Sequence, residues 1–427
     1  MLLFLALELG LAWLLLYFKL RARGDGQVGW TAAYRFWARV FALAFVLSFA
    51  AALPVLIQFG SLWPLLMEKI GDVAGPLLGA GVLSAYVFKS CFLGGMLFGQ
   101  RNLSERAHTL MVLMVAIGVT VSVFWLLVLL SWMHTPDGAV FADGQYQVHD
   151  WAAVIFNPAT VWYVALFVLA AALVTAFLIM GVVAAQSLRR PVDESGRLVF
   201  RSALWLAAVS ALLLGMAAAG AGRMVANHQP AKAAATVAYW DSSQPADLVL
   251  FAWPNTQNHV NERVWSLKGA AESWLGRDQS GAVQGLDKFS GMSPPVHATF
   301  WSFRLAVVTG LLMLLTAWLA LLRAHKAGYE PGELSKGLRY VLVAMSCSGG
   351  VLLLAGLAYV MVGAYPYAVQ GTITMSEIVS ESSVAVLLGG YLAHLVIYAL
   401  LLVSFFQMLR HIARFGVIPV ARRRGRA

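Results

Sequence analysis

Nine long apolar stretches dominate this 427-residue chain and leave it few ways to fold. They cover residues 2–18, 40–59, 76–98, 109–132, 161–187, 202–222, 301–322, 340–362 and 384–409. A helix needs roughly 20 mostly apolar residues to cross the hydrocarbon core of a bilayer. The strands of a membrane barrel would instead alternate apolar and polar residues. The sequence therefore predicts an all-α polytopic membrane protein with nine transmembrane helices.

The composition excludes the common soluble classes. Hydrophobic residues make up 60% of the chain and charged residues 12%, which is about half the charged share of an ordinary soluble domain. The net charge of +10 lies mostly in loops between the apolar stretches, so it predicts membrane orientation and no nucleic-acid partner. The two cysteines, Cys91 and Cys347, both lie in apolar stretches and form neither a CxxC nor a haem-attachment motif.

The distribution of basic residues predicts how the chain is oriented. Lys and Arg gather after the first, third, fifth and seventh apolar stretches and in the tail, whereas residues 133–160 and 363–383 contain none. Cytoplasmic loops of membrane proteins carry an excess of Lys and Arg. We therefore predict a multi-pass protein of a bacterial-type inner membrane, in contact with lipid, with its N-terminus outside and its basic C-terminal tail inside.

One long segment between the sixth and seventh stretches divides the chain. Residues 223–300 contain Trp253, Trp265 and Trp274, and no helical or strand period persists there. A loop of this length without regular structure is usually functional. We predict a six-helix membrane part (1–222), an outer cap (223–300) and a three-helix membrane part with a basic cytoplasmic tail (301–427).

Two opposite charges lie inside apolar stretches. Glu8 is in the first stretch and Lys89 in the third, and a charge at the centre of a bilayer costs at least ~3 kcal/mol unless it is paired or hydrated. Counted inward from the outside, both residues fall near the middle of the membrane. The sequence therefore predicts a Glu8–Lys89 ion pair, which either clamps two helices or belongs to a proton or ion path.

A series of short motifs resembles subunit I of the cytochrome bd quinol oxidases and runs through nearly the whole chain. The most specific are HQPAKAA at residues 228–234 and GLDKF at 285–289. The others, in order, are Phe36-Trp37, Gln58-Phe59-Gly60, Gly71-Asp72, Gly75-Pro76-Leu77, FGQRNL at 98–103, Phe156-Asn157-Pro158, Pro294-Pro295-Val296 and FWSFR ending at Arg304.

The resemblance implies a function as well as a fold. Family members carry two b haems and one d haem, and pass electrons from quinol to oxygen. The family's long outer loop, the Q-loop, helps to bind the quinol, and residues 223–300 match it. The resemblance also implies a hetero-oligomer with a second helical membrane subunit.

The side chains that carry redox chemistry in the family are replaced in this sequence. The two axial ligands of the low-spin haem fall on Leu166 and Ala306, and the glutamate that ligates a high-spin haem falls on Met361. The inward glutamate of the third helix is Lys89, and the Q-loop carboxylate is Val237. Leucine and alanine have no atom that can bind iron.

Two interpretations follow. The first is a haem-poor or haem-free membrane subunit of a respiratory electron-transfer complex, structural or quinone-contacting, with no haem held wholly within the chain and no catalytic or metal-ligating residue. The alternative is an active quinol:oxygen oxidoreductase with relocated haem ligands, which would bind b and d haems.

Lys232, Gln229 and Arg304 are the candidate contacts for a quinone or lipid headgroup. His394, which lies well inside an apolar stretch, is the candidate ligand for a haem at a subunit interface.

Overall fold

Long, nearly parallel helices form the body of the protein. The computed structural model describes residues 1–23, 27–61, 63–278, 280–379 and 383–415. Within them nine helical spans are long and apolar enough to cross a membrane, which confirms the predicted fold class. The spans are α1 (Leu2–Arg21), α2 (Val28–Ser61), α3 (Pro64–Ser84) continued by a π-helical turn (Ala85–Ser90) and α4 (Cys91–Phe98), α5 (Glu105–His134), α6 (Trp151–Ile155) with α7 (Thr160–Ser187), α8 (Glu194–His228), α10 (Val296–Lys326), α11 (Lys336–Ala344) with α12 (Ser348–Val362), and α13 (Val384–Phe415).

Helix α1 is the most enclosed element of the bundle. It packs against α2, α5 and α7, and Leu11, Leu15 and Phe18 on it are fully buried. Its apolar residues surround the whole helix, as is typical of a helix in the centre of a membrane bundle. Helix α13 is the opposite case: it packs mainly on α2, and most of its residues are exposed. The first helix therefore holds the bundle together, while the last lies along its outside.

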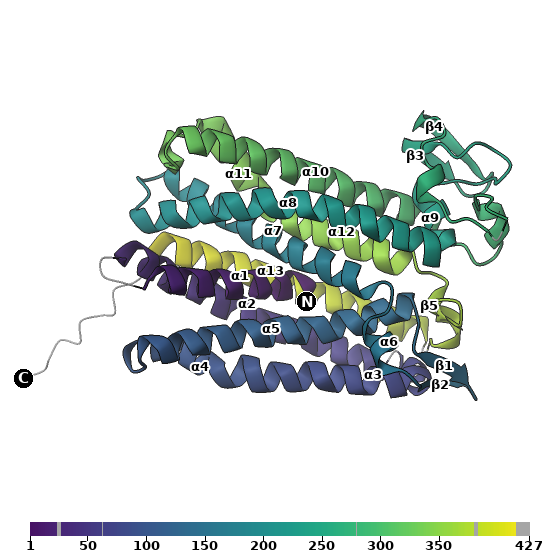
Figure 1. Cartoon of the computed structure of the whole chain (residues 1–427), viewed down its shortest axis with the longest axis horizontal. Coiled ribbons are helices and arrows are strands. Elements are labelled where there is room, and N and C mark those ends of the chain that lie inside the picture. The colour runs from purple at the N-terminus through teal and green to yellow at the C-terminus, as the bar shows by residue number, and fades with distance from the viewer. Residues whose placement is uncertain (24–26, 62, 279, 380–382, 416–427) are drawn as a thin grey trace, which may run out of the picture.

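The two ends of the bundle differ in chemistry. At one end, which we call the basic end, Lys19 pairs with Glu105 and Arg197 with Glu330. At the other, the hairpin end, lie three two-stranded antiparallel sheets (Figure 1). They are β1 (Ala139–Ala142) with β2 (Gln145–Val148), β3 (Leu248–Asn255) with β4 (Val260–Leu267), and β5 (Tyr367–Val369) with β6 (Ile373–Thr374). The orientation of these ends across the membrane stays a prediction, and residues 416–427 of the tail lie outside the described residues.

The cap has more regular structure than the sequence predicts. Helix α8 continues past the predicted boundary at residue 222, α10 begins before residue 301, and between them lie α9 (Pro230–Val237) and the β3–β4 hairpin. These elements enclose a small core of their own that includes Ala234, Val249 and Ala252. The sequence shows no sustained helical or strand periodicity here for two reasons. Helix α9 has only eight residues, and the strand pairing in the hairpin has two register shifts.

Candidate functional site

Lys232 is buried where the cap meets the bundle. Pro230 occupies the first turn of α9, where its missing N–H has no intrahelical partner to lose. The Lys232 side chain is 1% exposed, and its Nζ donates to the carbonyl of Val360 at 3.3 Å and lies 4.6 Å from the centre of the Tyr359 ring. No described carboxylate lies within ion-pair distance of it. Burial lowers the pKa of this amine to about 7.

Gln229 is also used inside the protein. It is buried, and its Nε2 donates to the carbonyl of His134 at the end of α5, at 3.0 Å. Two turns further along the chain, in α9, the Thr236 hydroxyl lies 3.0 Å from the hydroxyl of Tyr359 on α12. Gln229 and Thr236 therefore fasten α9 to two membrane helices, α5 and α12.

Arg304 joins α10 to the cap. Its guanidinium donates to the carbonyls of Leu250 at 2.9 Å and Thr236 at 2.8 Å, and to the carbonyl of Val249. A further bond reaches the carbonyl of Phe300 at 2.9 Å on its own helix. The planar fork of an arginine carries five N–H donors, so four carbonyls use most of them. The structure therefore gives Arg304 a structural role in holding β3 and α9 on α10.

Asn157 shows how another family-like motif is used. Its Oδ1 accepts from the Thr135 hydroxyl at 2.8 Å, and its Nδ2 donates to the Ser131 hydroxyl and the Val154 carbonyl, each at 3.0 Å. These bonds join the end of α5 to the turn between α6 and α7. A buried amide whose oxygen and nitrogen are both satisfied stabilises the turn that it caps.

Glu8 and Lys89 meet in the middle of the bundle. Lys89 Nζ lies 2.7 Å from Glu8 Oε1, the two side chains are 12% and 0% exposed, and Nζ lies 4.9 Å from the centre of the Phe45 ring. Ser48 on α2 donates a 2.6 Å hydrogen bond to the other carboxylate oxygen. The site therefore joins α1, α2 and the π-helical turn, and Ser48 is a member that sequence reasoning missed because serine is common in apolar helices.

The backbone around Lys89 is shaped for this contact. Lys89 lies in the π-helical turn Ala85–Ser90, which inserts an extra residue into a helix and reorients the side chains there. Gly118 of α5 lies directly against it: a Cβ at Gly118 would be 2.6 Å from the Lys89 nitrogen and 2.7 Å from Phe88 Cβ. Helix α5 can therefore approach the turn only because residue 118 has no side chain.

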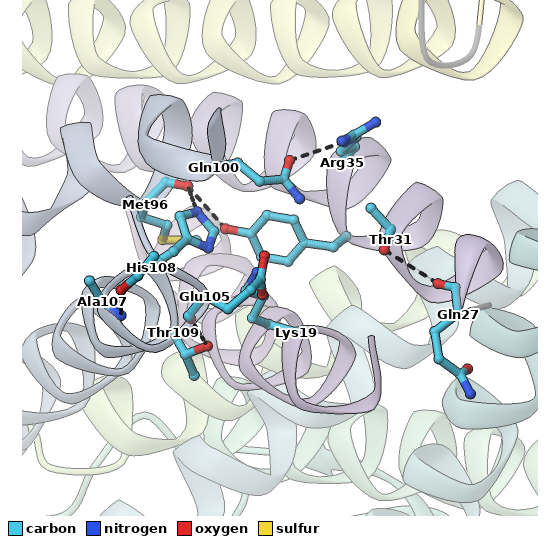
Figure 2. A network of polar contacts seen from close by, with 12 residues as sticks. Lys19, Gln27, Thr31, Arg35, Met96, Gln100, Glu105, Ala107, His108 and Thr109 are labelled. Carbon is cyan, nitrogen blue, oxygen red and sulfur yellow. Dashed lines mark hydrogen bonds and ion pairs between the residues drawn. The ribbon is translucent and has the colours of Figure 1, made fainter. Parts of the chain in front are cut away.

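A second polar network lies at the basic end (Figure 2). Lys19 is 3% exposed and pairs with Glu105 at 2.5 Å. The carbonyl of Met96 faces both Tyr34, whose hydroxyl donates at 3.0 Å, and His108 Nε2 at 3.1 Å. The sequence indicated Lys19 only as a loop charge, because nothing in it places Glu105 beside the end of α1.

The stretch of α1 between these two networks is apolar. Eleven positions separate Glu8 from Lys19, which is roughly 16 Å along a helix. The residues between them include the buried Leu9, Leu11 and Leu15. The contacts of the pair join α1 to α2 and to the π-helical turn, and the choice between a helix clamp and a proton or ion path stays a prediction.

His394 contacts backbone carbonyls on both sides. Its Nδ1 lies 2.6 Å from the carbonyl of Gly390, one turn earlier on α13, and its Nε2 lies 3.3 Å from the carbonyl of Pro54 on α2. Tyr398 donates to the carbonyl of Ala51 at 3.1 Å on the same face. These contacts attach α13 to α2 near its proline, and iron ligation by His394 would require one of them to break.

Two positions at which the resemblance places haem ligands hold side chains without a donor atom. Leu166 and Ala306 are half-buried and offer no donor atom. One turn before Leu166, the Trp162 ring packs directly on Gly220 of α8, so α7 and α8 are in close contact. Met361 is on the exposed side of α12.

Because Lys232 is buried, we expect the stability of the fold to depend on pH. Its folded-state pKa of about 7 is below the ordinary value of 10.5, so the unfolded chain binds more protons between these pH values. The stability of the wild type therefore rises with pH across this window, by up to ~1.4 kcal/mol per pH unit. Lys232→Met should have the higher Tm at pH 6, and its advantage should shrink by pH 9. Thermal unfolding at both pH values measures this, and a pH-independent difference would contradict it.

Comparisons with known proteins agree on one family. The model of the cytochrome bd terminal oxidase subunit I family matches residues 1–417. The chain is 30% identical over 367 residues to cytochrome bd ubiquinol oxidase subunit 1 of Bacillus subtilis (strain 168), which covers 82% of this chain and 77% of that protein. It is also 30% identical over 265 residues to cytochrome bd-II ubiquinol oxidase subunit 1 of Escherichia coli (strain K12), covering 61% and 51% of the two chains. Its fold matches bd oxidase from Geobacillus thermodenitrificans with a TM-score of 0.83, over 97% of this chain and 96% of that chain at 19% identity.

Proposed function

Because the chain belongs to the cytochrome bd terminal oxidase subunit I family, we propose that it is a haem-poor or haem-free membrane subunit of a respiratory electron-transfer complex. Membership confirms the resemblance found in the sequence motifs. Together with the nine apolar spans of the described residues, it makes the chain a multi-pass inner-membrane protein.

One observation carries the proposal: the family-like residues that remain form internal ties. Lys232, Gln229 and Arg304 bond to carbonyls of neighbouring helices and strands. The family's ligand positions Leu166 and Ala306 hold side chains that cannot bind iron. A scaffold preserved in this way, without its redox groups, supports a structural role. Contact of Lys232 with a quinone headgroup would require α9 to move, because the amine is buried.

The proposal includes a second helical membrane subunit. Helix α13 exposes Val384, Tyr391 and Leu400 by 80%, 61% and 61%. The end of α3 and the π-helical turn likewise expose Val82, Leu83 and Tyr86. Apolar helices of a membrane subunit need cover from either lipid or another subunit, and bd oxidases are multi-subunit complexes. The predicted orientation, with the hairpin end outside, is part of the same proposal.

Pyridine-haemochrome analysis of the purified chain tests the haem content. We expect less than one haem per chain, because the described helices offer no axial ligand pair at the family's positions. A family member that keeps its ligands, expressed in the same host, is the positive control. If haem is found, the variant His394→Ala distinguishes a haem bound through His394 from haems bound through other ligands. Reduced b-type or d-type bands that persist in this variant would overturn the proposal and favour the active quinol:oxygen oxidoreductase. Bands lost with His394 would indicate a single interface haem.

A further inference from the structure

An aromatic face covers one side of the β3–β4 hairpin. Phe251, Trp253 and Trp265 are 45%, 52% and 68% exposed, and Phe251 pairs with Trp265 across the two strands. The opposite side of the hairpin carries Val249 and Ala252, which are buried in the core of the cap. The exposed side of the hairpin therefore carries three large aromatic rings, with Glu262 across from Trp253, and this chain leaves that side uncovered.

The aromatic face continues onto a membrane-spanning helix. The Phe251 and Trp253 rings lie 5.3 and 6.1 Å from the ring of Trp301 on α10. From Trp301, one face of α10 runs through Leu305 and Val308, both about half exposed, at the spacing of successive helical turns. The exposed apolar surface of a transmembrane helix is thus continuous with the hairpin.

The position of the hairpin fits the edge of a bilayer. It lies at the corner of the bundle, beyond the first turn of α10 and displaced outward from its side (Figure 1). Arg304 fixes it there, because its guanidinium donates to the β3 carbonyls of Val249 and Leu250. The aromatic face is therefore held beside the N-terminal end of the α10 span, and the ends of a membrane-spanning helix lie near the headgroup layer.

We propose that this aromatic face, formed by Phe251, Trp253 and Trp265, rests in the headgroup layer of the membrane and anchors the cap to the lipid. Tryptophan is enriched at membrane interfaces because its ring is apolar while its N–H can still reach water or headgroups. Arg263 and Lys268, on and beside β4, are exposed and supply positive charge for lipid phosphates. This inference depends on the transmembrane fold alone and is independent of haem content.

An environment-sensitive fluorophore on the hairpin tests the proposal. In a full-length Cys91→Ser, Cys347→Ser background, NBD is attached at Trp265→Cys on the aromatic face, or at Gln257→Cys in the turn of the same hairpin as the matched control. The protein is studied in phosphatidylcholine nanodiscs with and without 5-doxyl phosphatidylcholine. We expect blue-shifted emission at position 265 and quenching by the doxyl lipid at least threefold stronger than at position 257.

Two results would overturn the proposal. Water-like emission with equal quenching at both positions would mean that the face is in solvent. Blue-shifted emission without quenching by the doxyl lipid would mean that protein covers it instead. Phe251→Cys and Asn258→Cys provide the same comparison should a variant of the first pair not fold, as judged by circular dichroism and gel filtration.

Discussion

Lys89→Ala should destabilise the protein by about 3–5 kcal/mol, the usual cost of removing one partner from a buried ion pair. The variant leaves Glu8, which is 0% exposed, with the hydrogen bond from Ser48 as its remaining polar contact. The free energy of unfolding, measured by denaturant titration in mixed micelles, gives the effect. A matched control is Lys69→Ala on α3, because Lys69 makes a longer pair, 3.7 Å from Glu377, at the surface. Surface pairs contribute at most about 1 kcal/mol.

The double variant Glu8→Leu, Lys89→Met separates a coupled pair from two independent charges. Both replacements are apolar and close in size to the originals, so the pair disappears without leaving an unpaired charge. We expect the double variant to be more stable than Lys89→Ala by at least 1 kcal/mol. If the double variant were as unstable as the sum of the two single variants, Glu8 and Lys89 would not be coupled.

Arg304→Met should release the cap from the bundle and cost about 3 kcal/mol or more. The substitution removes the side-chain donor from three carbonyls of the cap, those of Thr236, Val249 and Leu250, whereas the Phe300 carbonyl keeps its backbone partner within α10. A buried acceptor left without a partner costs about 1–3 kcal/mol, and some of these carbonyls will regain water. Limited proteolysis should show faster cleavage within residues 238–295, and thermal unfolding should show a lower Tm.

Two further variants make this result specific. Arg304→Lys should recover only part of the loss, because an ammonium cannot reproduce the planar fork of a guanidinium. Arg323→Met, at the other end of α10, replaces an exposed arginine and should change stability by no more than about 0.5 kcal/mol. Unchanged cleavage of the cap in Arg304→Met would show that the three bonds from Arg304 to the cap do not hold it.

Several contacts at the candidate site involve groups that have no sequence signature. The motif at residues 228–234 indicates Lys232 and Gln229, but their actual partners are the carbonyls of Val360 and His134. Every residue has a carbonyl, so no motif can identify these acceptors. The same holds for Arg304: the sequence allowed it to cap the loop or to contact a headgroup, but it could not identify the backbone oxygens of Thr236 and Leu250 that it binds.

The sequence by itself determined the number of spans and the need for Glu8 to have an opposite charge nearby. Both follow from the bilayer, which penalises each unsatisfied backbone group and each unpaired charge wherever the helices lie. The tertiary structure alone decided which helices are neighbours. It placed Ser48 beside Glu8, Glu105 beside Lys19, and the carbonyl of Pro54 beside His394. It also turned the aromatic side of the hairpin outward. These contacts join residues far apart in the chain, and they depend on helix packing, which an apolar sequence in an apolar solvent specifies only weakly.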